Sequence, residues 1–329
     1  MQQVSKIGFI GFGRAAELIY LPLMTNFPNV KVSAITEIRK DRREFAAIKF
    51  KGCKIYDTIC DEFINDIDAA IILTPPNYRI QPLTEILKNQ KNVLVEKPLS
   101  LSLDGIKDLL NFNNNTSSKL AVAFNHRYWN PINELKEIIA NKNEEVVSAE
   151  IVFVSNYSNW NPISSESNPL EDLAPHIFDL VRYIFDDEIV SIESTENSKD
   201  DFSFDVKTSK KLSVKCRAAY TVKSLRTIKI KTSKNEYLVR SGSEKIKPPT
   251  EIIRSILDFK DKLQRGLMRK KSSLKNSYKF QLEDFFNLNK GVKHRLAGLS
   301  DGIENIKAIL AANKSLSEKG RKVFLNEFE

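Results

Sequence analysis

The chain has 329 residues, of which 41% are hydrophobic and 28% charged, and its formal net charge is +9. This composition is that of a soluble globular protein with room for two domains, and no apolar stretch reaches the ~20 residues that a membrane-spanning helix requires. Three scattered cysteines form neither a metal-ligand spacing nor a disulfide framework, and the first residues lack the pattern of a signal peptide. We therefore expect a cytoplasmic protein without a metal site, whose positive charge attracts anions. No nucleic-acid reader motif accompanies that charge, so we expect no nucleic-acid partner.

The first motif is a glycine-rich turn between a predicted strand, residues 6–10, and a predicted helix that opens at Ala16. The turn reads Gly11-Phe12-Gly13-Arg14-Ala15-Ala16, the G-x-G-x-x-A form of the dinucleotide-binding fingerprint. The first glycine permits the tight turn, the second lets the backbone approach a pyrophosphate, and the small alanine lets the helix pack closely on the strand. Because helix N-termini attract anions, we predict that residues 11–15 (Gly11, Phe12, Gly13, Arg14 and Ala15) hold the phosphates of a dinucleotide. The alternative is a glycine turn that binds nothing.

A second predicted strand, residues 30–35, leads to Glu37. An acidic side chain at this place accepts hydrogen bonds from the ribose hydroxyls and repels a 2′-phosphate, so it favours NAD over NADP. Arg39 and Lys40 follow closely and could instead answer a 2′-phosphate. A solvated Glu37 is the third interpretation.

Two further predicted strands end in motifs that reach the same edge of a parallel sheet. Residues 68–73 lead into Thr74-Pro75-Pro76-Asn77, and residues 93–95 lead into Glu96-Lys97-Pro98. Ligands of open α/β sheets bind beyond the carboxyl ends of the strands, so we expect a cofactor cleft there. Its predicted lining residues are Thr74, Pro75, Asn77, Glu96 and Lys97. A surface ion pair before a turn is the alternative for the two charged residues, and the proline raises the chance of a cis Lys97–Pro98 peptide.

Strands and helices alternate through residues 1–124, which predicts a Rossmann-type, doubly wound parallel sheet. From residue 125 onward strand patterns dominate instead. They cover residues 146–154, 189–193, 212–220, 227–231 and 236–239. We predict an α/β protein with a dinucleotide-binding Rossmann domain at 1–124 and an α+β substrate-binding and oligomerisation domain at 125–329. The second domain would carry a large, open, mostly antiparallel sheet whose free face serves a homodimer or homotetramer.

One helical segment, residues 172–183, interrupts the strand patterns of the second half. Asp172 and His176 are four residues apart, which places them on one face if the first turn is helical, and Pro175 is tolerated only in that first turn. A carboxylate beside an imidazole orients the ring for proton transfer at neutral pH. A buried histidine with satisfied hydrogen bonds is the alternative. The chain has only two other histidines, His126 and His294.

Five motifs, taken in their order and spacing, resemble the glucose–fructose oxidoreductase/inositol dehydrogenase (Gfo/Idh/MocA) family. They are the glycine turn of residues 11–16, Thr74-Pro75-Pro76, Glu96-Lys97-Pro98, Asn125-His126-Arg127 and Asp172-x-x-x-His176-x-x-Asp179. The carboxyl-terminal stretch 280–325 also looks like that family, so the resemblance covers nearly the whole chain and is weakest between residues 190 and 278.

The resemblance implies reversible NAD(P)-dependent oxidation of a hydroxyl on a sugar, nucleotide sugar or cyclitol. Lys97 would hydrogen-bond the reacting hydroxyl near the nicotinamide, Asp172 would orient the proton-transfer system, and His176 would accept or donate the substrate proton. Arg127 and Asp179 would hold substrate or neighbouring side chains. The chemistry agrees, because removing a hydride from a secondary alcohol requires a base near its oxygen and a cation that stabilises the developing charge.

The chain departs from the family at three places, which concern the substrate region more than the three chemical residues. Residues 167–170 replace a usual glycine-rich run, Ala174 replaces a usual glycine, and Arg79 stands where a histidine is usual. We expect Arg79 to be a solvated residue on its helix. If it points into the cleft instead, it favours an anionic substrate such as a nucleotide sugar.

Residues 252–271 combine apolar side chains at helical spacing with many cations. We expect a helix that packs one face on the sheet and solvates the other, and peripheral contact with an anionic membrane is the alternative. Two rival functions stay open. One is a reductase of a keto sugar or an imine, and the other is an NAD(P)-binding sensor without turnover.

Overall fold

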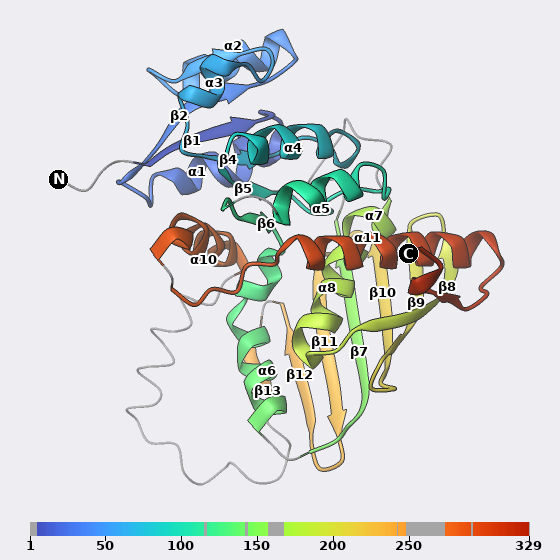
Figure 1. The fold of residues 1–329 in the computed structure, drawn as a ribbon. Helices are drawn as coiled ribbons and strands as arrows, with labels where there is room; N and C mark the ends of the chain where they lie inside the picture. Colours follow the sequence, from blue (N-terminus) through green and yellow to red (C-terminus); the bar gives the residue numbers. More distant parts are fainter. Residues whose placement is uncertain are drawn as a thin grey trace, which may run out of the picture. The chain divides into compact units, whose positions relative to one another are not determined.

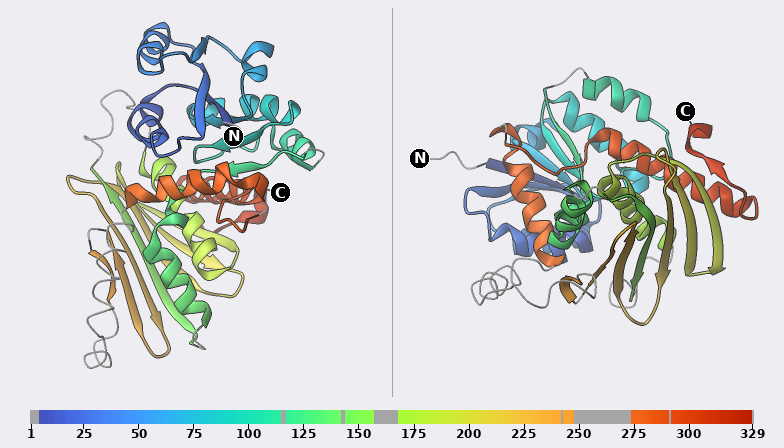
Figure 2. Two further views of the ribbon diagram at one scale, coloured as in Figure 1. Left: turned by 90° about the vertical axis from the view of Figure 1, so that its left-hand side faces the viewer. Right: turned by 90° about the horizontal axis from the view of Figure 1, so that it is seen from below.

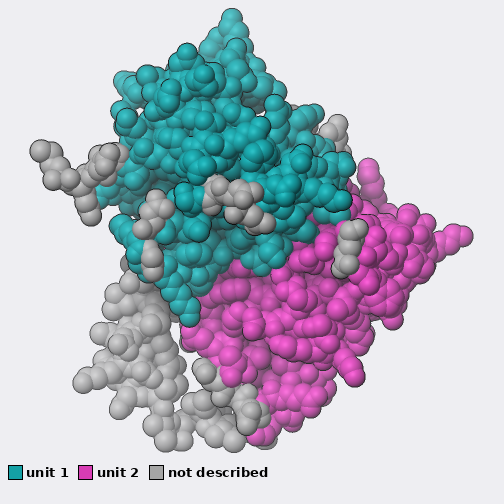
Figure 3. Space-filling view, in the orientation of Figure 1, with its two compact units in different colours: residues 1–124, 281–303 teal, residues 125–280, 304–329 magenta. Residues whose placement is uncertain are grey.

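The structure, a computed structural model, describes residues 5–114, 117–141, 144–156, 168–241, 243–247, 274–290 and 292–328 (Figure 1). The basic stretch 252–271 lies outside these described residues. The chain divides into two compact units, coloured separately in Figure 3. Unit 1 comprises residues 1–124 and 281–303, and unit 2 comprises residues 125–280 and 304–329. No helix among the described residues is long and apolar enough to cross a membrane.

Unit 1 contains a six-stranded sheet in the order β3-β2-β1-β4-β5-β6, and every pair in it is parallel. The strands are β1 (Ser5–Ile10), β2 (Val30–Thr36), β3 (Lys54–Tyr56), β4 (Ala69–Ile72), β5 (Asn92–Val95) and β6 (Leu120–Val122). The short apolar strands are buried because helices cover a parallel sheet on both faces. This architecture confirms the predicted doubly wound fold. The strand order reverses between β1 and β4, which is where such sheets bind their ligands.

The helices of unit 1 connect these strands. They are η1 (Ala16–Tyr20), α1 (Leu21–Met24), α2 (Lys40–Lys49), α3 (Asp61–Asn65), η2 (Pro76–Tyr78), α4 (Ile80–Lys88), α5 (Ile106–Asn114) and η5 (Leu288–Lys290). The π-helical η1 follows the glycine turn directly. The late segment 281–303 joins this unit through Ala297, which pairs with Val122 at the edge of β6. A Cβ on Gly302 would lie 2.8 Å from Leu99, so the glycine permits this close approach.

Unit 2 contains an eight-stranded sheet in the order β13-β12-β11-β7-β10-β9-β8-β14. The strands are β7 (Val146–Ser155), β8 (Ile189–Ser198), β9 (Asp201–Thr208), β10 (Ser213–Tyr220), β11 (Leu225–Thr232), β12 (Glu236–Arg240), β13 (Ser243–Lys247) and β14 (Val323–Phe324). Among the described strands only β7 and β10 pair in parallel, so the predicted mostly antiparallel sheet is confirmed.

Helices of unit 2 cover one face of this sheet (Figures 1 and 2). They include η3 (Asn125–Tyr128), α6 (Asn130–Asn141), α7 (Pro169–Asp172) and α8 (Ala174–Phe185). Helix α8 packs on β7, β8 and β10. Along β9, buried and more exposed residues alternate, which is the period expected for a sheet with one covered face. Two longer helices, α10 (Leu274–Phe286) and α11 (Leu299–Ser317), run from one unit into the other.

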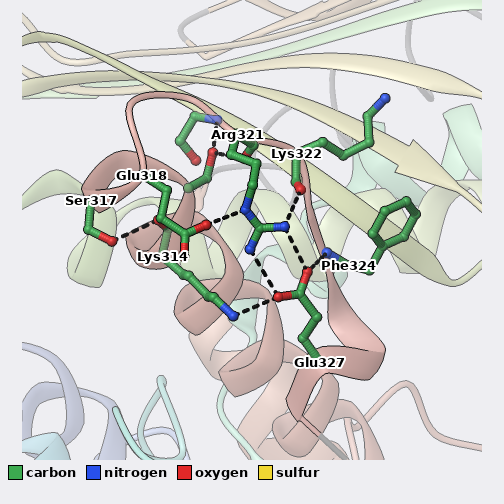
Figure 4. A network of polar contacts seen from close by, with 9 residues as sticks. Lys314, Ser317, Glu318, Arg321, Lys322, Phe324 and Glu327 are labelled. Carbon is green, nitrogen blue, oxygen red and sulfur yellow. Dashed lines mark hydrogen bonds and ion pairs between the residues drawn. The ribbon is translucent and has the colours of Figure 1, made fainter.

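The carboxyl-terminal turn η6 (Leu325–Phe328) is tied to α11 by a surface network (Figure 4). The Glu327 carboxylate accepts hydrogen bonds from Lys314 Nζ at 2.6 Å, from Arg321 Nη2 at 3.0 Å and from the Phe324 backbone N–H at 3.0 Å. These donors, Arg321 first, lower the pKa of Glu327 to about 2. The network fastens the turn beside β14 and carries no predicted site residue.

Candidate active site

The glycine turn of unit 1 forms an open cradle at the carboxyl end of β1. Gly11 has φ +86°, and a Cβ there would lie 3.1 Å from the Thr74 backbone nitrogen, so this position requires glycine. An added Cβ on Gly13 would meet nothing within 4 Å. The backbone is therefore accessible at Gly13, as the approach of a pyrophosphate requires.

Arg14 supplies an unsatisfied donor at this cradle. Its Nε atom is buried and has no hydrogen-bond partner among the residues that the structure describes. Buried N–H groups in native proteins are nearly always paired, so an unpaired one calls for an acceptor that the described residues do not provide. Together with the open position at Gly13, this donor fits the anionic phosphates of a dinucleotide. The residues present thus fit NAD(P), and Arg14 and the backbone of residues 11–15 would hold its phosphates.

Glu37 braces the glycine turn from the end of β2. Its Oε2 accepts a hydrogen bond from the Phe12 backbone N–H at 2.7 Å, and its Oε1 accepts one from the Arg39 backbone N–H at 3.0 Å. Glu37 is only 9% exposed, so the interpretation of a solvated side chain is wrong. Each carboxylate oxygen has a further lone pair, so both oxygens could still accept a ribose hydroxyl. The side chains of Arg39 and Lys40, by contrast, are 51% and 84% exposed.

Glu37→Gln separates the two roles of this carboxylate. We expect this substitution to weaken NAD binding about 10-fold or more relative to NADP binding, because the charge that favours ribose hydroxyls over a 2′-phosphate is removed. Isothermal titration of both cofactors measures the ratio. Arg39→Gln is the matched control and should leave NAD affinity unchanged. Equal weakening of both cofactors by Glu37→Gln would show that the carboxylate only braces the turn.

The ends of β4 and β5 are joined by Arg79, which is 5% exposed. Its Nε donates to the Thr74 carbonyl at 2.8 Å, and its Nη1 donates to the carbonyls of Glu96, at 2.6 Å, and Pro98. The interpretation of Arg79 as a solvated helix residue is therefore wrong, and its Nε and Nη1 groups bind main-chain carbonyls. The cause is local, since the two strands end here and leave carbonyl groups that need donors. Burial lowers the pKa of Arg79 to about 10, against the opposing charge of Glu96, so the guanidinium stays charged at neutral pH.

The motif after β5 is held by hydrogen bonds on both sides of Lys97. Glu96 is buried, and its Oε1 accepts from the Tyr20 hydroxyl at 2.7 Å while its Oε2 accepts from the Lys97 backbone N–H at 3.1 Å. The interpretation of a surface ion pair does not fit a buried Glu96. The Lys97–Pro98 peptide is cis. The half-buried Lys97 thus stands between two residues whose carbonyls Arg79 binds.

In unit 2, His176 lies in the first turn of α8 and forms a pair with His126 of η3. The two Nδ1 atoms are 3.1 Å apart and the ring centroids 4.2 Å apart. On its other side His126 accepts at Nε2 from Arg226 Nε of β11, at 3.0 Å. Both histidines are buried, His126 at 2% and His176 at 6% exposure. Three side chains from distant parts of the sequence therefore form one hydrogen-bonded chain.

Asp172 closes α7, one turn before His176. Its Oδ2 accepts a hydrogen bond from the Tyr220 hydroxyl of β10 at 3.3 Å. The Asn168 side chain caps α7 by accepting from the Glu171 backbone N–H at 3.0 Å, so this short helix begins with an ordinary N-cap where the family's glycine-rich run is missing. Pro175 sits in the first turn of α8, as its chemistry demands.

Arg127 and Asp179 bind each other. Arg127 Nε lies 3.1 Å and 3.0 Å from the two Asp179 oxygens, and Arg127 Nη2 lies 2.6 Å from Oδ1. Their side chains are 8% and 1% exposed. Breaking a buried pair of this kind costs about 3–5 kcal/mol because the remaining charge is left uncompensated. The pair fixes η3 against α8 one residue after His126 and one turn after His176.

Sequence reasoning misses three members of these clusters. The sequence shows His126 within Asn125-His126-Arg127 but does not identify it as the ring partner of His176, and Tyr220 and Arg226 look like ordinary strand residues. The presence of just three histidines is the one available signal for His126.

Parts of this sequence are similar to a family of oxidoreductases and to individual dehydrogenases. Residues 5–124 match the model of an oxidoreductase family with an NAD-binding Rossmann fold. Glucose-6-phosphate 3-dehydrogenase of Bacillus subtilis is 26% identical over 216 residues, which are 62% of this chain and 59% of that protein. Inositol 2-dehydrogenase/D-chiro-inositol 3-dehydrogenase of Lacticaseibacillus casei is 29% identical over 198 residues, 58% of this chain and 56% of the relative. The matches thus span less than two thirds of the length of these relatives.

Solved structures share the fold over nearly the whole chain. Myo-inositol dehydrogenase from Lactobacillus casei, in complex with NAD(H) and myo-inositol, has a TM-score of 0.78 at 20% identity and covers 98% of this chain and 97% of its own. The WlbA dehydrogenase from Bordetella pertussis, in complex with NADH and UDP-GlcNAcA, has a TM-score of 0.82 at 13% identity and covers 98% of each chain.

Proposed function

We propose that the chain, whose residues 5–124 match the model of an NAD-binding Rossmann oxidoreductase family, is a Gfo/Idh/MocA enzyme that transfers hydride between NAD(P) and a secondary hydroxyl or keto carbon of a sugar, nucleotide sugar or cyclitol. The observation that carries this proposal is the cradle of residues 11–15, with open space at Gly13 and a buried Arg14 donor that has no partner among the described residues. When bound there, NAD(P) supplies the hydride chemistry.

The chain's own residues would manage the proton and the charge at the reacting oxygen. We propose that His176 exchanges the substrate proton, that Asp172 orients the residues of this transfer, and that the Lys97 ammonium stabilises negative charge on the oxygen. These roles are supported by the hydrogen bonds that fix the segments on which Lys97 and His176 lie. Lys97 follows a motif fixed by Arg79 and Glu96, and His176 lies on a helix fixed by a buried ion pair.

The bracing of Glu37 supports NAD as the preferred cofactor, since a buried carboxylate at this place disfavours a 2′-phosphate. The substrate range follows the named activities of the relatives, which act on a sugar phosphate and on inositols. Because Arg79 binds main-chain carbonyls, it gives no support for an anionic substrate, and the remaining support for one is the net charge of +9. We also expect a homodimer or homotetramer, which sedimentation equilibrium of the purified chain tests.

The deciding experiment is a turnover screen that follows reduced nicotinamide. Sugars, sugar phosphates, cyclitols and nucleotide sugars are offered with NAD and with NADP, and keto sugars and imines with the reduced cofactors. Gly13→Val is the matched background control. Its side chain enters space that is empty in the fold, so the protein should fold normally but exclude the pyrophosphate.

Turnover of a hydroxyl or keto substrate that disappears in Gly13→Val is the expected result. Turnover of imines alone would favour the rival reductase. Tight cofactor binding in the wild-type protein without turnover of any member of the panel would contradict the enzyme and favour the sensor.

A further inference from the structure

We propose that Arg226, acting through His126, fixes the tautomer of His176, so that neutral His176 carries its proton on Nε2 and takes the keto form of the substrate. This inference rests on the proposed function for the role of His176, but the ring states that it assigns exist without substrate. Arg226 is a positioning residue, since it reaches His176 only through His126.

The first step is the contact between Arg226 and His126. A guanidinium has only donors, so His126 Nε2, 3.0 Å from Arg226 Nε, must accept and cannot carry a proton. A doubly protonated His126 would be a cation beside the Arg226 guanidinium, and its Nε2–H would point at the Nε–H of Arg226. His126 is therefore neutral, with its single proton on Nδ1.

The second step passes this constraint to His176. The two Nδ1 atoms are 3.1 Å apart, and one of them must donate to the other. Because the proton of His126 lies on Nδ1, His126 donates and His176 Nδ1 accepts. The proton of neutral His176 is then on Nε2. If His176 Nδ1 donated to His126 Nδ1 instead, His126 would carry its proton on Nε2, where it would meet the Arg226 N–H donor.

Two features hold the three side chains in place. Arg226 and Phe153 are cross-strand partners in β11 and β7, and the Phe153 ring lies 5.5 Å from the Arg226 guanidinium carbon and 5.0 Å from the His126 ring centroid. The buried Arg127–Asp179 pair fixes the backbone next to His126 relative to α8. Both rings are almost inaccessible, so water does not readily replace the shared hydrogen bonds.

The consequence concerns the form of substrate that the resting site receives. A carbonyl oxygen only accepts hydrogen bonds, so it matches the Nε2–H of neutral His176, which polarises it as hydride arrives. When the Nε2 proton passes to the new alkoxide, the Nδ1 proton of His126 moves to His176 Nδ1, and the negative charge left on the His126 ring faces the Arg226 guanidinium. An alcohol needs an acceptor for its proton. His176 Nε2 can accept only if the neutral His176 ring carries its proton on Nδ1 instead, and His126 would then carry its own proton on Nε2, facing the donor of Arg226. The resting pair is therefore arranged for the keto form.

Nitrogen-15 NMR of the three histidine rings in the full-length protein, without substrate, tests the assignment. We expect His126 as the Nδ1–H tautomer, which is the less common form of a free imidazole, and His176 as the Nε2–H tautomer. The exposed His294 is the internal reference for a solvated ring. Arg226→Met should return His126 to a mixture dominated by Nε2–H, whereas Arg226→Lys should preserve the wild-type pattern.

Arg217→Met removes a cation from β10, which is separated from β11 by β7 and where Arg217 pairs with Asp201, and should leave all ring signals unchanged. An Nε2–H tautomer at His126 in the wild-type protein would overturn the proposal, as would unchanged ring signals in a folded Arg226→Met variant. If Arg226→Met does not fold, the wild-type and Arg226→Lys spectra still decide. The expected ring states in a protein without turnover would refute the proposed function and leave the tautomer assignment standing.

Discussion

Replacing His176 with alanine is expected to lower kcat by about 10²- to 10⁴-fold, the usual contribution of a general acid or base, while cofactor affinity stays within a factor of about two. The expectation follows from where the residues lie in the chain. The predicted cofactor-binding residues all belong to unit 1, and His176 belongs to α8 of unit 2. Steady-state kinetics on the substrate found in the screen, with isothermal titration of NAD, measure both quantities.

The alanine variant also leaves the Nδ1–H of His126 without its acceptor, which costs about 1–3 kcal/mol of folding free energy. His176→Gln keeps an acceptor in reach of that proton but cannot exchange a proton, so it should restore stability and not turnover. His294→Ala, at an exposed position, is the matched control and should behave as the wild type. Undiminished turnover in His176→Ala would remove His176 from the chemistry altogether.

The strands that lead into the motifs of the first sheet were predictable because their signals are local, whereas the short edge strand β3 was not predicted. A β-branched apolar run followed by Gly11 and Gly13 predicts a strand, a tight turn and a phosphate cradle without any knowledge of the rest of the chain. The order of the motifs then predicted the family. One local signal was overlooked in the second sheet. Strand β9 alternates Phe202, Phe204 and Val206 with more exposed residues, which is a period of two that the sequence carries openly.

The partners of the site residues could not be predicted, because their positions depend on strand register and on long-range packing. Arg226 meets His126 across 100 positions of sequence, and only the pairing of β11 with β7 brings it there. Arg79 looks like any helical arginine until β4 and β5 are seen to end beside it. In both cases the sequence shows a cation and the fold decides what it binds.

Arg79→Leu is expected to destabilise the protein by about 3 kcal/mol or more and to lower kcat of the remaining folded enzyme. Three carbonyls lose a charged donor, those of Glu96 and Pro98 in buried hydrogen bonds and that of Thr74 in a part-buried one, and each such hydrogen bond contributes about 1.5–3 kcal/mol, though not additively. Lys97 lies between two of these carbonyls. A displacement of about 1 Å of a reacting group can cost roughly 100-fold in rate.

Urea unfolding and steady-state kinetics at saturating cofactor separate the two effects. Arg79→Lys retains the charge but, as a single ammonium, cannot reproduce the planar guanidinium fork across two strand ends, so its stability should fall between leucine and wild type. Lys88→Met, which removes an exposed cation from the far end of α4, controls for the loss of charge and should change neither quantity. If Arg79→Leu unfolds at the wild-type urea concentration and turns over normally, the position of Lys97 does not depend on Arg79. If it is destabilised but turns over normally once folded, Arg79 supports only the fold of unit 1. If Arg79 positions Lys97 by joining the ends of β4 and β5, Arg79→Leu should lower both the stability to urea and the turnover number, and NAD affinity should stay unchanged.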